Sequence, residues 1–267
     1  MKKMIYILPL LFVALFSACE VESGDSSYPR TLQGKIAFNE VEGRLSQCVS
    51  LLALMTKVDY YGQAPIDEKE GIKNYFLRDY VITNTEDTWT LKDDYKEMVF
   101  THNKKSLNES GEIWTIKVTI KLWDGETITM IKEQNFRVES MGDKDWRIKT
   151  YDLKLFSPTH GYSYPTENVC NSELSVKGVK AYDKSPNLYD FKIEEGKGSL
   201  NMNKTNIGFQ LLQPASYSYS TSTSLNLIIS SGELDITADK DKIKAKVIAS
   251  GYYPVVEITL NGLTETY

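Results

Sequence analysis

The fold of this chain is decided by one alternating stretch, Trp114-Thr115-Ile116-Lys117-Val118-Thr119-Ile120-Lys121-Leu122. Successive side chains of a β-strand point to opposite faces, so the alternation predicts a strand with one buried face and one solvated face. The pair Asp124-Gly125 follows and is typical of a tight hairpin turn into a second predicted strand, Thr127–Ile131. The stretch therefore predicts an antiparallel hairpin near the middle of the chain.

The same pattern continues beyond this hairpin. A turn at Gly142-Asp143-Lys144 is predicted to join Phe136–Val138 to Trp146–Ile148, and the strand pattern then runs on to Leu153–Phe156. Consecutive strands joined by short turns form an antiparallel meander.

Two helices are predicted before the meander. In the first, apolar residues recur at helical spacing and form one stripe, made of Val41, Leu45, Cys48, Val49, Leu52 and Met55. Its other side is predicted to be polar and to carry Glu40, Glu42, Arg44 and Gln47. The period therefore predicts an amphipathic helix with one buried face.

The second helix is predicted to begin at Pro65-Ile66-Asp67, where Asp67 and Glu70 have the spacing of a capping box. Its predicted buried stripe contains Ile72, Tyr75, Phe76 and Tyr80. Two helices followed by an antiparallel meander indicate an α+β domain, which we place at residues 31–157.

The arrangement resembles the cystatin-like and nuclear-transport-factor-2-like domains. The residues that carry the resemblance are the helical stripe Val41–Met55 and the closing strand Asp145-Trp146-Arg147-Ile148, and it covers about half of the chain. The resemblance implies helices packed on a curved meander. It also implies a cone-shaped pocket, in which an enzyme would need a carboxylate beside His102 or a tyrosine inside the cavity.

The second half of the chain shows no helical period. Residues 158–171 contain Pro158, Gly161 and Pro165 and are predicted to be a linker, and residues 172–267 a β-rich domain. Eight short strands are predicted there, namely Leu174–Val179, Tyr189–Ile193, Ser199–Met202, Ile207–Leu211, Leu225–Ile229, Leu234–Ile236, Ile243–Ala249 and Val255–Leu260. Their number and spacing predict an all-β sandwich- or barrel-like domain. Gly196-Lys197-Gly198 is read as a hairpin, and Tyr217–Ser224 as an exposed loop or an edge strand.

The N-terminus has the order of an export signal. Met1-Lys2-Lys3 is basic, Met4–Phe16 is apolar, and the small pair Ser17-Ala18 precedes Cys19. The stretch Leu15–Cys19 resembles the lipobox of bacterial lipoproteins, which implies a signal peptide at residues 1–18 and a lipid on Cys19. An ordinary secretory signal with a chance cysteine is the alternative.

The resemblance to lipoproteins also implies a subcellular localisation. Residues 19–30 are polar and acidic and are predicted to be a flexible tether. A lipid-anchored protein of the outer membrane, on its periplasmic or its cell-surface side, is the expectation. The membrane is then a partner through the anchor at Cys19.

Composition limits the other partners. The 267 residues include 31 basic and 36 acidic side chains, and removal of the signal with Lys2 and Lys3 leaves 29 against 36, a net charge near −7. Nucleic acid is not an expected partner, because phosphate binding needs clustered Lys and Arg. Cys48 and Cys170 would both lie in an oxidising compartment, and the sequence leaves open whether they form a disulfide.

Motifs for catalysis or for cofactors do not stand out. The two histidines, His102 and His160, are not part of a metal-ligand pattern, so no metal and no cofactor are expected. No nucleophile elbow or glycine-rich phosphate loop is present. The sequence favours a protein that is not an enzyme, without excluding catalysis.

Aromatic residues are the remaining candidates for binding. Tyr162/Tyr164 and Tyr217/Tyr219 have strand spacing that places both rings of a pair on one face, and Trp123 is a further candidate. Tyrosine is also a good strand former, so a structural role is the alternative. The sequence therefore predicts an extracytoplasmic binding protein whose ligand is a glycan or an envelope protein. An enzyme with a pocket in the α+β domain and a structural or adhesion subunit are the alternatives.

Overall fold

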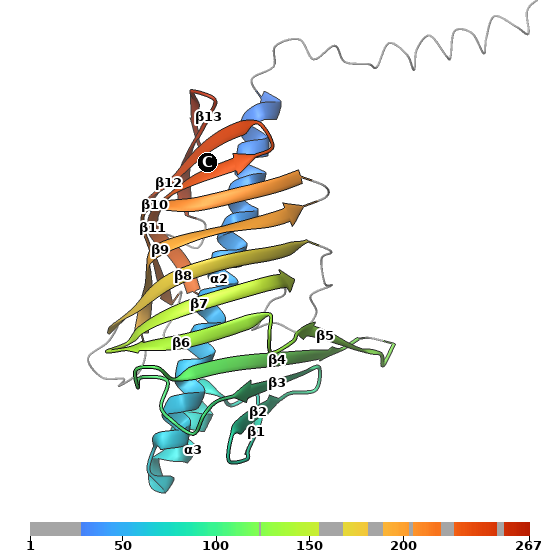
Figure 1. Cartoon of the computed structure of the whole chain (residues 1–267), viewed down its shortest axis with the longest axis vertical. Helices are drawn as coiled ribbons and strands as arrows, with labels where there is room; N and C mark the ends of the chain where they lie inside the picture. The colour runs from blue at the N-terminus through green and yellow to red at the C-terminus, as the bar shows by residue number, and fades with distance from the viewer. Residues whose placement is uncertain are drawn as a thin grey trace, which may run out of the picture.

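One long helix runs along the axis of the molecule, and a single antiparallel sheet of 14 strands curves around it (Figure 1). The computed structural model describes residues 28–122, 124–154, 168–180, 189–202, 205–219, 227–249 and 254–267. The described helices are α2 (Tyr28–Gln63) and α3 (Ile66–Phe76). We call the face of the sheet toward α2 the inner face and the opposite face the outer face.

The first seven strands lie toward the end of the molecule that holds α3 (Figure 1). They are β1 (Val81–Asn84), β2 (Thr88–Lys92), β3 (Lys96–Thr101), β4 (Ile113–Lys121), β5 (Thr127–Ile131), β6 (Phe136–Gly142) and β7 (Asp145–Lys154). The other strands continue toward the N-terminal end of α2 (Figure 1). They are β8 (Val169–Lys180), β9 (Tyr189–Met202), β10 (Thr205–Tyr219), β11 (Leu227–Ala238), β12 (Asp241–Ala249), β13 (Val255–Leu260) and β14 (Leu263–Thr266).

Each strand pairs with the next along the chain, with one exception. Strand β4 pairs with both β3 and β6, and β5 leaves the main path to pair with β4 alone. The order of the sheet thus follows the order of the sequence, which is the meander that the tight turns predict.

The predicted central hairpin is confirmed. Strand β4 has alternating burial from Ile113 to Lys121, and it pairs with β5 across the turn at Asp124-Gly125. Gly125 has φ +87°, a left-handed conformation that suits glycine. The Asp124 carboxylate accepts a hydrogen bond from the Glu126 N–H at 3.0 Å. The second predicted turn, at Gly142-Asp143-Lys144, likewise joins β6 to β7.

The helix α2 differs from the predicted amphipathic helix. Its apolar stripe is buried as expected, but Arg44 and Gln47, which were expected on the solvated side, are only 1% and 3% exposed. Every residue from Leu51 to Asp59 is buried. The reason is that the sheet curves around the helix instead of covering one side of it. Polar side chains on several sides of α2 are therefore also buried against other parts of the chain.

The helix α3 begins where the sequence predicts, yet the predicted capping box does not form. Pro65 occupies the N-cap position, and no side chain caps the helix there. Asp67 lies inside the first turn, where its negative charge favours the positive end of the helix dipole. Ile72 and Tyr80 are buried as predicted, although Tyr80 lies beyond the end of the helix.

The predicted sandwich- or barrel-like second domain is wrong, because the later strands extend the first sheet. Strand β7 pairs with β8 from Asp145↔Lys177 to Lys154↔Val169, across the predicted linker 158–171. One apolar core, enclosed between α2 and the inner face, runs through both halves. Gly196 and Gly198 lie inside β9 and not in a hairpin, so two predicted short strands are one long strand that continues the sheet.

Candidate ligand-binding groove on the outer face

Two hollows lie together on the outer face of the sheet, over β7 to β10. One has a volume of about 630 Å³ and its neighbour a volume of about 460 Å³. Both are lined by Glu173, Lys197 and Gln210, so they form one continuous depression, which we call the outer groove. Further residues along it include Arg147, Lys149, Tyr151 and Asn171.

Strand β9 lines the outer groove with two glycines, Gly196 and Gly198, at positions where core side chains pack closely against the backbone. A Cβ on Gly196 would lie 2.7 Å from Leu211 Cδ1, and a Cβ on Gly198 would lie 2.4 Å from the Asn171 carbonyl oxygen and 2.6 Å from the Phe209 ring. Core side chains therefore take the space that side chains of β9 would fill. A larger residue at either position would therefore disturb the packing beneath the outer groove.

A row of charged and polar side chains crosses the outer groove from strand to strand. The register pairs Lys149 with Glu173, Glu173 with Lys197, and Lys197 with Gln210. Neighbours in such a row share one face of the sheet and lie within contact distance of one another. The groove therefore presents hydrogen-bond donors and acceptors in alternation, with no large area of one charge.

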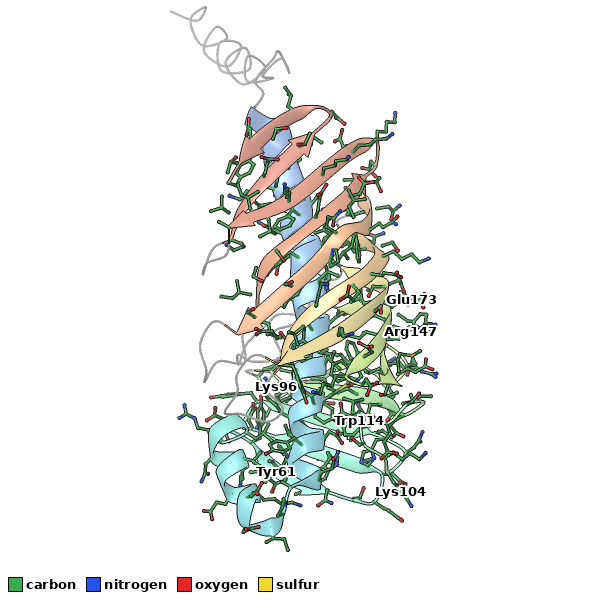
Figure 2. The ribbon with its side chains drawn as sticks, turned by 90° about the vertical axis from the view of Figure 1, so that its left-hand side faces the viewer. Tyr61, Lys96, Lys104, Trp114, Arg147 and Glu173 are labelled. Atoms are coloured by element: carbon green, nitrogen blue, oxygen red, sulfur yellow. The ribbon has the colours of Figure 1, made fainter. Side chains whose placement is uncertain are left out.

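Glu173 is the acidic centre of this row. Its carboxylate lies 3.4 Å from Lys149 Nζ and 3.9 Å from Arg147 Nε, and Figure 2 labels Arg147 and Glu173 on adjacent strands. All three side chains are partly exposed, and ion pairs of this kind contribute about 1 kcal/mol or less. A polar ligand can therefore replace these contacts at small cost.

Tyr151 is the exposed aromatic ring of the outer groove, with 54% of its surface accessible. Its backbone is held firmly, because its N–H donates to the Asn135 carbonyl at 2.9 Å and its carbonyl accepts from Asn135 Nδ2 at 2.7 Å. The next residue, Asp152, has φ +46°, and its N–H donates to Asn171 Oδ1 at 3.0 Å. This irregular stretch of β7 holds the backbone that carries a flat ring with a polar tip beside amide and charged groups, an arrangement suited to stacking on a sugar ring.

The structure describes few of the residues that the sequence singled out. Cys19, Trp123, Tyr162 and Tyr164 lie outside the described residues, and Tyr219 is the last residue of β10. The sequence missed Tyr151 and its neighbours. The alternation from Asp145 to Thr150 is a signal that places Arg147 and Lys149 on the wet face, but the pairing of β7 through β10 that gathers the groove is a long-range property.

Tyr217 is described and belongs to the core. It is 0% exposed, and its hydroxyl has no hydrogen-bond partner among the described residues. Burial raises its pKa well above the ordinary value, and the nearby Glu42 and Cys48 raise it further. A ligand could reach this ring only if the packing between β10 and α2 opened.

His102 lies beside a carboxylate, as the enzyme alternative requires, but it lines none of the cavities described here. Its ring stacks on Trp114 with centroids 4.7 Å apart, and its Nδ1 accepts the Lys104 N–H at 2.9 Å. Burial lowers the pKa of His102, while Glu112 and Asp87 raise it. The carboxylate of Glu112 is itself engaged with the Asn103 N–H at 2.7 Å. These contacts define a turn that is held together by its own side chains.

Between α2 and the inner face, the described residues form a packed apolar core. A small cavity of about 30 Å³ lies near Asp59, Gln63 and Tyr189, enough for about one water molecule. No group of three or more residues that could hold a metal ion occurs in the described part of the chain. In the same part, neither helix is both long and apolar enough to cross a membrane.

Comparisons with known proteins give no relative from which a role could be transferred. No family model matches the chain, and neither a curated protein nor a solved structure matches it. The site is therefore interpreted from its own geometry.

Proposed function

We propose that this chain is a lipid-anchored extracytoplasmic binding protein of the outer membrane, held there through Cys19, and that it binds a glycan in the outer groove. The single observation that carries the ligand assignment is the exposed ring of Tyr151 beside a row of alternating polar groups. The anchor rests on the order of basic, apolar and small residues before Cys19.

A glycan fits this groove better than other classes of ligand. Sugars offer many hydroxyl groups, each of which donates and accepts hydrogen bonds, and the row Lys149, Glu173, Lys197 and Gln210 offers both kinds of partner. An apolar ligand would find little apolar surface in this row. An open trough across four strands also suits an extended chain of sugar units better than a compact molecule.

The ligand assignment is tested by titrating the purified full-length protein with a panel of soluble oligosaccharides and measuring heat or intrinsic fluorescence. The variants Tyr151→Ala and Lys197→Ala are expected to bind a responding glycan at least about tenfold more weakly, which corresponds to 1.4 kcal/mol. The matched control is Lys244→Ala, an exposed lysine on the outer face of β12, outside the groove. Equal affinity in all three variants, or no response to any glycan, would contradict the proposal.

The anchor is tested separately with Cys19→Ala. Cells grown with a labelled fatty acid are expected to incorporate the label into the wild-type chain and not into the variant, which should leave the membrane fraction. Protease treatment of intact cells then distinguishes the two sides of the outer membrane, because only a surface copy is cleaved. Wild-type chain that carries no lipid would disprove the anchor without affecting the glycan assignment.

A further inference from the structure

Two buried thiols face the interface between α2 and the sheet. Cys48 lies on α2 and Cys170 on β8, and each is only 1% exposed. Both are free cysteines in the structure. They are about 120 residues apart in the sequence, so only the tertiary fold brings them together.

Arg44 shows which part of the sheet this turn of α2 covers. Its guanidinium donates to the Leu153 carbonyl at 3.5 Å and to the Asn168 carbonyl at 3.2 Å. Leu153 is the register partner of Cys170. Arg44 therefore lies over the point where β7 and β8 pair at Cys170.

Cys48 follows Arg44 by one helical turn, on the same side of α2. Its thiol hydrogen-bonds to the side chain of Ser172, which is the residue after Cys170 on the same face of β8. The Ser172 hydroxyl in turn lies 2.8 Å from Thr150 Oγ1, which also donates to the Cys170 carbonyl at 3.4 Å. The two thiols thus belong to one packed cluster, and the nearness of Cys170 raises the pKa of Cys48.

We propose that Cys48 and Cys170 become joined by a disulfide while the exported chain folds, so that a covalent bond ties α2 to β8. One thiolate attacks a disulfide oxidant and releases one of its thiols, and the second thiolate then displaces the other. The bond between the two sulfurs forms, both cysteines lose their protons, and the oxidant is reduced to a dithiol. This inference goes beyond the glycan site and uses the proposed export only to supply an oxidising compartment.

The timing follows from the surroundings of the thiols. Burial raises the pKa of Cys48 well above its ordinary value and that of Cys170 to about 11, and only the thiolate is reactive. Once the core has closed, the pair is shielded from an oxidant. The exchange therefore has to take place before α2 packs on β8.

The test uses the full-length chain with Cys19→Ala, which leaves only these two cysteines. The chain is unfolded, reduced, and refolded either with reduced and oxidised glutathione or with a reducing agent alone. Digestion without reduction and mass spectrometry are expected to show one linked pair of peptides, two hydrogens lighter than the separate peptides, only in the first sample. That sample should also melt several degrees higher. Oxidant added after refolding in reducing agent should leave both thiols free.

The single variants Cys48→Ser and Cys170→Ser are expected to lose the linked peptides and the difference in melting temperature between the two conditions. Circular dichroism establishes that each sample is folded. The proposal is overturned if folded wild-type chain refolded with glutathione retains two thiols that react with an alkylating agent after denaturation. It is equally overturned if the linked peptides come from two different chains.

Discussion

The two halves of the sheet, β1–β7 and β8–β14, use the same antiparallel pairing but control their shape in different ways. In the first half the strands are short and end at tight turns such as Asp124-Gly125. In the second half β8 to β11 are each at least 12 residues long, and irregularities within the pairing bend them. In the first half Gly125 and Gly142 lie at tight turns, whereas in the second half Gly196 and Gly198 lie inside a strand. Glycine thus serves two purposes: at a turn it allows a positive φ, and inside a strand it leaves room for core atoms that a Cβ would meet.

The largest expected effect tests this difference directly. In Gly198→Ala the new methyl group meets the Asn171 carbonyl oxygen and the Phe209 ring, and a backbone atom cannot move aside, so we expect a loss of about 3 kcal/mol or more in unfolding free energy. In Gly125→Ala the methyl group meets nothing within 4 Å, and the cost of about 1 kcal/mol comes from φ +87° alone. Chemical denaturation followed by circular dichroism measures both. Similar losses at the two positions would contradict the comparison.

The second-largest expected effect on stability concerns the hydrogen bonds between α2 and the first half of the chain. Asp59 Oδ2 accepts hydrogen bonds from Ser106 Oγ at 3.0 Å and from the buried Leu107 N–H at 3.1 Å. In Asp59→Ala both donors lose their acceptor, which we expect to cost about 2 kcal/mol in unfolding free energy. Asp59→Asn is the matched control, because its amide oxygen can still accept from Ser106 and Leu107. The Gln63 amide, which donates to Asp59 Oδ1 at 2.8 Å, can turn over to accept from the new NH2 group, so this variant should cost less than about 1 kcal/mol. Equal losses in thermal or chemical unfolding would show that the charge matters more than the acceptor.

The smallest effect concerns Glu42, on the part of α2 that faces the second half. Burial raises the pKa of Glu42 from 4.5 to about 7, so the folded chain holds this proton more tightly than the unfolded chain. The associated stability is present below pH 4.5 and is lost as the pH rises through about 7. Since Glu42 keeps partial contact with solvent, we expect a decrease of only about 1 kcal/mol from this group. Unfolding measured between pH 4.5 and 8 should show this decrease in the wild type and not in Glu42→Gln; parallel curves would refute it.

The difference between the halves also explains what the sequence could predict. The alternation of Trp114 to Leu122 and the two turns that follow are local signals, and each was sufficient to place a strand or a hairpin. The helical period of α2 is local as well. The burial of Arg44 and Gln47 is not local, because it depends on how far the sheet curves around the helix.

The candidate site was less predictable than the fold. Aromatic spacing predicted Tyr217 as a binding residue. Tyr217 lies on the inner face of β10, between β9 and β11, and this face is buried. Tyr151 lies beside the irregularity between Thr150 and Leu153, where the simple alternation fails. Asn171, which accepts the N–H of the neighbouring Asp152, comes nineteen residues after Asp152, on the next strand. Sites that are assembled across strands need the register, and the register is set by the whole core.

The position of α2 at the start of the chain also has a kinetic consequence. Gly34 packs against Ile258, and Ser46 donates to the Leu227 carbonyl, 181 residues away. Contacts between such distant residues form slowly, since a long loop has to close before they can stabilise anything. Since a chain is synthesised from its N-terminus, the apolar sides of α2 stay exposed until β11 to β13 have been made and have packed against it. Exposed apolar surface of this kind favours aggregation, so we expect a chain cut short before β11 to aggregate instead of folding.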